Sequence, residues 1–253
     1  MNRPTEKDLE AAKAYLRLRL DAEHSMENNL GSVMREAAER IIDICYSAKI
    51  DPTVVSFEKM PLAVRQQIEA VVQWLKETID DYFLTLAIYD HEDNRDEILP
   101  FILGENHGKT FNERLIDYCE KYRDELFLLI GAGLFLGFGA NALAKSIGGH
   151  LKKPYNNPEL VEGIAAPLTY GRGKTNSMFT ALSDLTRFGI SQAWMKNQYL
   201  NNIKDGCVGW YVQRGSSYYC ELCDSMVGFH TEEEDLPPYH NHCCCIATPI
   251  FVK

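Results

Sequence analysis

The chain has 253 residues, of which 45% are hydrophobic and 25% are charged, as in a folded globular protein. This balance excludes a disordered chain and a low-complexity fibre. The formal net charge of -10 argues against a general nucleic-acid coat, although a local basic face stays open. The length allows one large domain or two small ones.

The first half of the chain is predicted to be helical. Thr5 and Asp8 have the spacing of a capping box ahead of the run 9–16. A second helix is expected over about 33–44, and Pro61 can start a third, because apolar residues recur there every three or four positions. A charged loop is expected over 90–97, and the helical pattern resumes at 111–125.

The segment 126–144 is uncharged and, at 19 residues, just reaches the length that spans a bilayer. One hypothesis is therefore a membrane-associated protein that inserts this segment. The alternative is a buried helix in a large helical core. Each of its four glycines, at 131, 133, 137 and 139, weakens a helix in water by about 1 kcal/mol. The glycines favour a break in the helix or tight packing, so we do not expect a membrane partner.

The chain changes character after residue 150. Residues 151–176 are rich in turn formers, and a further helix is expected over about 177–201. Between Lys145 and Lys204 there are eight basic and three acidic residues, a net charge of +5. Such a stretch could meet phosphate or an acidic partner, although an ordinary solvated face has the same composition.

Strand patterns follow Gly206, at 209–213 and 245–251. The predicted fold is mostly α, with a helical body and a small β-rich C-terminal module, an α+β arrangement. We expect three parts: a helical body over 1–150, a basic loop and helix connector over 151–205, and a Cys/His-rich module over 206–253.

Five of the eight cysteines fall between residues 220 and 245. A secreted disulfide scaffold spreads its cysteines as a framework, so this clustering indicates one local site in a reducing compartment. The N-terminus is charged and has no apolar signal core, which also predicts a protein made and kept in a cytoplasm.

The strongest chemical pattern is a Cys-x-x-Cys pair followed by a His-x-x-Cys pair. Cys220, Cys223, His240 and Cys243 place four soft donors around a loop, and Cys245 could replace either member of the second pair. Zinc prefers four such donors in a tetrahedron, and a module of this size needs stabilisation beyond its own core. The sequence therefore predicts a structural zinc site. A redox-active thiol pair and reduced, merely buried cysteines are the alternatives.

The same region resembles a known family. The pattern Cys-x-x-Cys at 220–223, Gly228, the run 237–245 with its Pro, His and Cys residues, and Pro249 is similar to the C-terminal signature of Mu F-like minor head proteins of tailed phages. Trp210 also stands where such proteins often carry an aromatic residue. The match covers roughly residues 206–250.

The resemblance implies a minor capsid protein that acts in phage head morphogenesis and is not an enzyme. Its expected partners are the portal protein, capsid or scaffold proteins and, in some members, DNA during packaging. It implies a place in the virion interior, and in the host bacterial cytoplasm during assembly. On this reading the basic stretch is the DNA- or portal-binding face, with Lys152, Lys153, Arg172 and Lys174 as its candidate residues.

A zinc-stabilised nuclease or toxin acting on DNA is the enzymatic alternative. It requires an exposed general base and a divalent ion. His230 and His242 are the candidate bases, and the acidic run 232–235 is a candidate ion site.

Overall fold

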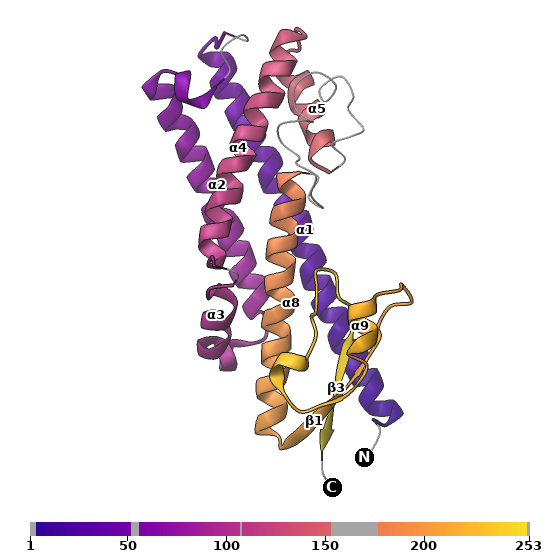
Figure 1. The fold of residues 1–253 in the computed structure, drawn as a ribbon. Helices are drawn as coiled ribbons and strands as arrows, with labels where there is room; N and C mark the ends of the chain where they lie inside the picture. Colours follow the sequence, from indigo (N-terminus) through magenta and orange to yellow (C-terminus); the bar gives the residue numbers. More distant parts are fainter. Residues whose placement is uncertain (1–3, 52–55, 107, 153–176, 252–253) are drawn as a thin grey trace. The chain divides into compact units, whose positions relative to one another are not determined.

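The structure is a computed structural model that describes residues 4–51, 56–106, 108–152 and 177–251. Most of the described chain is helical, and a small three-stranded antiparallel sheet lies near the C-terminus (Figure 1). The α+β fold class predicted from the sequence is therefore confirmed.

The helices follow one another through the first 204 residues. The described α-helices of this part are α1 (Glu6–Ser47), α2 (Leu62–Ile88), α3 (Arg95–Leu103), α4 (Phe111–Phe135), α5 (Ala140–Lys152) and α8 (Met178–Lys204). The C-terminal part contains β1 (Cys207–Gln213), the short helix α9 (Glu221–Ser225), β2 (Gly228–His230) and β3 (Ile246–Phe251).

The chain divides into two compact units. Unit 1 comprises Met1–Met26, Phe83–Asn106 and Asp184–Lys253, and unit 2 comprises Glu27–Tyr82 and His107–Ser183. The predicted division at residues 150 and 205 follows composition along the chain and stays a prediction.

Helix α1 begins at the predicted capping box. The Asp8 carboxylate accepts hydrogen bonds from the Thr5 backbone and hydroxyl, and the Thr5 hydroxyl accepts one from the Asp8 backbone N–H. The helix then continues for 42 residues, so the two helices expected over 9–16 and 33–44 are one. The expected loop at 90–97 is also wrong in part, since η3 (Glu92–Asn94) and the first turn of α3 occupy it.

Unit 2 has an aliphatic interior. The apolar faces of its helices are buried at the expected three- and four-residue spacing, for example at Met34 in α1, Leu75 in α2 and Leu126 in α4. The hydroxyl of the buried Tyr122 donates to the Met34 carbonyl oxygen at 2.7 Å, which satisfies the one polar atom of that ring.

The apolar segment 126–144 is not one helix. Helix α4 ends at Phe135, Gly137 adopts a positive φ of 76°, and α5 begins at Ala140. Gly133 also permits close packing, because a Cβ there would lie 2.5 Å from Leu143 Cδ1. Both effects expected of the glycines are confirmed. No helix in the described part of the chain is long and apolar enough to cross a membrane.

Candidate metal centre

The sheet of unit 1 is the scaffold of the C-terminal module. Strand β1 pairs antiparallel with β2 on one side and β3 on the other. Trp210 of β1 is buried and stacks on Tyr199 of α8, with ring centroids 5.1 Å apart. Arg214 forms an ion pair with Asp224, which ties the end of β1 to α9.

Helix α9 has Cys220 at its N-cap and Cys223 in its first turn, which brings the first two sulfur donors together. Cys220 and Cys223 are three residues apart, so the first helical turn places both side chains on one side. His240 Nε2 lies 3.4 Å from Cys220 Sγ and 3.0 Å from Cys223 Sγ. These three residues form the first of two overlapping groups of potential ligands.

The orientation of the His240 ring is fixed by the backbone. Its Nδ1 lies 2.6 Å from the Asn241 carbonyl oxygen, and this hydrogen bond raises the pKa of the imidazole. A bond to a carbonyl requires the proton on Nδ1, so in the neutral ring the lone pair of Nε2 points at the sulfurs. Metal-binding histidines are typically held by such a contact.

The second group shares Cys223 and adds Cys243 and Cys245, and all three are buried. Cys223 Sγ lies 4.0 Å from Cys243 Sγ. Cys244 lies outside both groups, and its thiol donates to the His242 carbonyl oxygen at 3.5 Å. Cys243 and Cys245 therefore share one side of the chain, as expected for an extended stretch.

The three thiols of the second group differ widely in pKa. A hydrogen bond from Cys245 lowers the pKa of Cys243 to about 5, and the same contact raises the pKa of Cys245. Burial raises the pKa of Cys223 to about 12. One thiolate is thus stabilised by neighbouring S–H groups, and a divalent cation would displace those protons.

The separations within each group are close to those around a tetrahedral ion, but the predicted set Cys220, Cys223, His240 and Cys243 does not form a single group. Zn–S and Zn–N bonds of ordinary length require about 3.8 Å between two sulfurs and about 3.6 Å between sulfur and nitrogen. The corresponding distances are 4.0 Å for the Cys223–Cys243 pair and 3.0–3.4 Å for His240 with its two cysteines. The Cys/His cluster, defined as Cys220, Cys223, His240, Cys243 and Cys245, could therefore hold a metal ion.

Two further contacts support the loop that carries Cys243. Arg19 of α1 is buried, and its Nη2 donates to the Cys243 carbonyl oxygen at 2.6 Å. Gly215 leaves space for the Cys244 backbone, because a Cβ at residue 215 would overlap the Cys244 carbonyl oxygen. Sequence reasoning identified neither residue.

Arg19 belongs to a buried charged group. Glu23 lies 3.3 Å from Arg19 Nε and 3.5 Å from Arg187 Nη2, so one carboxylate is flanked by two guanidinium groups. Burial nevertheless raises the pKa of Glu23, because desolvation outweighs the attraction of the two cations. Removing one member would leave a buried charge without its full set of partners.

The candidate bases of the nuclease hypothesis are engaged in contacts. His230 Nε2 lies 2.9 Å from the Met226 carbonyl oxygen, and its Nδ1 lies 3.2 Å from Asp235. His242 is exposed and its Nε2 lies 3.1 Å from Asp184. In the acidic run 232–235, Glu233 pairs with Lys196 at 2.6 Å.

Part of the basic stretch is also engaged. Arg187 pairs with Glu23, Lys196 pairs with Glu233, and Lys204 donates to Asn94. Three of the four residues predicted to bind DNA or portal, Lys153, Arg172 and Lys174, lie outside the described residues. Lys152 ends α5, where only the backbone is described.

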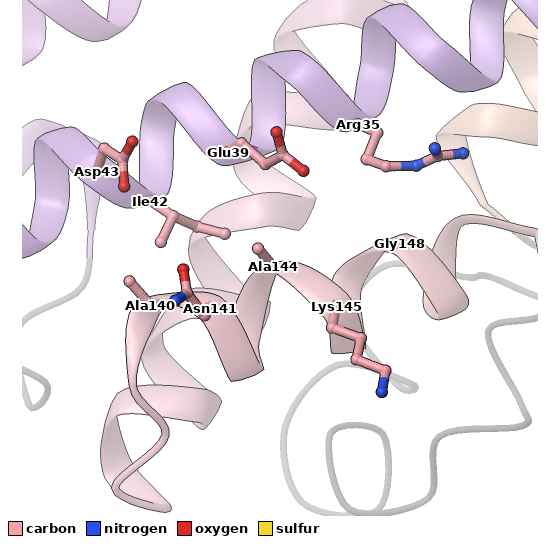
Figure 2. A pocket seen from close by; sticks show the side chains of 9 residues that line it. All are labelled: Arg35, Glu39, Ile42, Asp43, Ala140, Asn141, Ala144, Lys145 and Gly148. Atoms are coloured by element: carbon pink, nitrogen blue, oxygen red, sulfur yellow. The ribbon is translucent and has the colours of Figure 1, made fainter.

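Lys145 lies at a cavity of about 630 Å³ in unit 2. Arg35, Glu39 and Asp43 of α1 face α5 across it, as Figure 2 shows. The cavity mixes charges of both signs, so it lacks the uniformly positive potential that attracts a phosphate backbone.

Comparison of the chain with protein-family models, curated proteins and solved structures finds no match.

Proposed function

We propose that this chain is a minor head protein of a tailed phage or prophage, with a structural role in head assembly. The observation that carries the proposal is the Cys/His cluster, whose members stand at the positions of the Mu F-like signature and whose donor atoms lie within 4.8 Å of one another in each group. The proposed partners are the portal protein, capsid or scaffold proteins, and packaged DNA.

We also propose zinc as the metal. Thiolate and imidazole donors suit zinc, and a cytoplasm keeps the cysteines reduced for it. Each group supplies three donors and the two groups share Cys223, so a tetrahedral ion with four protein ligands would draw on both groups. Four protein ligands would leave no position for a reacting water, so that arrangement would have a structural role.

Metal analysis tests the zinc proposal. The protein purified from cells grown with added zinc should carry one zinc per chain. Cys223→Ser, which removes the donor shared by both groups, should reduce the zinc content strongly, whereas Cys244→Ser is the matched control and should not. A zinc-free wild-type protein that keeps its C-terminal fold would contradict the proposal.

Co-assembly tests the head proposal. The chain should co-purify with the portal protein encoded in the same phage or prophage genome, and it should be found inside procapsids made with it. Failure to enter procapsids would contradict the head role.

Incubation with linear duplex DNA and Mg²⁺ tests the enzymatic alternative. We expect intact DNA. Cleavage that disappears in His242→Ala or His230→Ala would make the chain a nuclease, while a salt-sensitive gel shift without cleavage would support DNA contact during packaging.

A further inference from the structure

An exposed aromatic surface lies in the C-terminal module, on the loop that joins β1 to α9 and on α9 itself (Figure 1). Tyr218 and Tyr219 are each 84% exposed, although aromatic side chains usually bury much of their area. Leu222 of α9 and Val227, just after it, are half-exposed apolar side chains. These four residues, here called the tyrosine surface, lie outside the Cys/His cluster. Exposed tyrosines next to aliphatic side chains are typical of a protein contact surface.

The loop that carries the two tyrosines is held by its backbone, which leaves the rings exposed. Arg214 pairs with the Asp224 carboxylate of α9 and also donates to the Tyr218 carbonyl oxygen, so one guanidinium group joins the loop to the helix. The Tyr218 N–H donates to the Ser216 hydroxyl at 3.2 Å. A partner therefore meets a loop that is already ordered, which lowers the entropic cost of binding.

The module that carries the tyrosine surface is acidic. Residues 206–251 contain six acidic side chains and one basic one, a net charge of -5. The basic one, Arg214, is already in its ion pair with α9. Glu221 stands between Tyr219 and Leu222 in the chain, is exposed, and forms no ion pair with another described residue. A carboxylate without a cation thus accompanies the exposed rings.

The acidic run 232–235 lies near the other end of the surface, at Val227. His230 connects the two, since its Nε2 lies 2.9 Å from the carbonyl oxygen of Met226 and its Nδ1 lies 3.2 Å from Asp235. Only one of the four carboxylates in the run pairs with a lysine or arginine of the described chain. Negative charge therefore flanks the tyrosine surface, which favours a positively charged ligand.

We infer that the tyrosine surface binds an arginine-bearing segment of a partner protein. A guanidinium group stacks on aromatic rings and pairs with carboxylates, and this surface offers both within a few residues. Leu222 and Val227 accommodate apolar side chains beside the arginine. Nucleic acid is disfavoured, because the same carboxylates would repel its phosphates. The inference goes beyond the proposed head role and does not depend on it.

An NMR titration of the full-length, ¹⁵N-labelled protein, purified from cells grown with added zinc, tests the inference. The probe is an acetylated and amidated peptide of sequence Arg-Leu-Gly-Arg-Leu. We expect saturable shifts of the backbone amides of Tyr218, Tyr219 and Leu222, and weaker binding as salt is raised, because salt screens exposed charges. The same peptide with citrulline in place of arginine keeps the shape without the charge and should bind about tenfold more weakly.

Variants locate the binding on the surface. The double variant Tyr218→Ser with Tyr219→Ser should weaken binding of the arginine peptide by about tenfold, and the fold should be unchanged because both rings are exposed. Tyr89→Ser removes an exposed tyrosine outside the module and is the matched control, which should bind normally. Glu221→Gln should weaken binding by about threefold, as expected for one exposed ion pair.

Several outcomes would overturn the inference. These are an absence of saturable shifts, equal binding of the citrulline peptide, and unchanged binding by the double tyrosine variant. Single-stranded oligothymidylate is titrated in parallel, and if it shifts the same amides at lower concentration than the arginine peptide, the surface is a nucleic-acid site and the inference is wrong. Failure to enter procapsids bears only on the head role, so the two proposals can fail separately.

Discussion

Unit 2 and the C-terminal module both have a buried interior, but the kinds of side chain that form it differ. The interior of unit 2 is built from aliphatic and aromatic residues on long helices. The module buries a cluster of eight residues, and four of them, Cys207, Cys223, Cys243 and Cys245, are cysteines. Sulfur thus occupies positions that leucine or isoleucine would fill in the helical unit.

The difference follows from size. Three short strands and a one-turn helix enclose too little apolar area to offset the entropy of ordering the chain. Metal binding supplies the missing free energy where donors are gathered in the folded state and dispersed in the unfolded state. The helices of unit 2 have enough buried surface and need no such centre.

If the Cys/His cluster holds the proposed zinc, removal of that zinc should produce the largest effect. Structural zinc contributes about 10–16 kcal/mol of apparent binding free energy in small zinc modules, so a chelator should unfold residues 207–251. Hydrogen exchange would then show lost protection in β1 and β3 and retained protection in α4. An equal loss of protection in α4 would contradict the proposal that only the C-terminal module depends on metal.

A core truncation in unit 2 should destabilise the helices of that unit and leave the Cys/His cluster intact. Leu126→Ala removes a fully buried side chain and should lower the free energy of unfolding by about 3 kcal/mol, as measured by chemical denaturation. Metal content should not change. Leu136→Ala is the matched control, because Leu136 is about half exposed and its truncation should cost far less.

Arg19 offers a finer test within unit 1. Arg19→Met leaves the Cys243 carbonyl without its donor and Glu23 with one cation fewer, which should cost about 3 kcal/mol. The double variant Arg19→Met with Glu23→Leu should recover part of that loss, because no buried carboxylate remains. A double variant less stable than the single one would contradict this account.

The pH dependence contributed by His91 should be the smallest effect. Burial lowers the pKa of His91, while Asp90 acts in the opposite direction. Asn197 Nδ2 lies 2.9 Å from His91 Nδ1, a contact that needs the neutral ring. The stability from His91 is therefore complete above its unfolded pKa of about 6.5 and is lost as the pH falls toward the lower folded value.

Denaturant titrations over this pH range would measure the effect. The slope of the free energy of unfolding against pH should be shallower in His91→Gln. A slope that is unchanged in His91→Gln would contradict this assignment.

The sequence predicted features whose parts lie near one another along the chain. The capping box at Thr5 and Asp8 and the break near Gly137 depend on local conformation. The Cys/His cluster depends on short spacings that one helical turn and one extended stretch can satisfy. Such patterns are visible without knowledge of the tertiary structure.

Features that depend on distant segments were not predictable. His91 and Asn94 stand in a charged run, yet both are buried and bonded to residues of α8 more than 100 positions later. Nothing in the pattern around Arg19 marks it as the partner of the Cys243 carbonyl.

The contact between Arg19 and Cys243 joins residues 224 positions apart, and it has a consequence for biosynthesis. Synthesis runs from the N-terminus to the C-terminus, so Arg19 leaves the ribosome well before the loop that covers it. Arg19 therefore has no carbonyl from this loop until Cys243 emerges, and the Cys/His cluster cannot be completed before Cys245. Until then the nascent chain carries Arg19 without the backbone partner that it has in the folded unit.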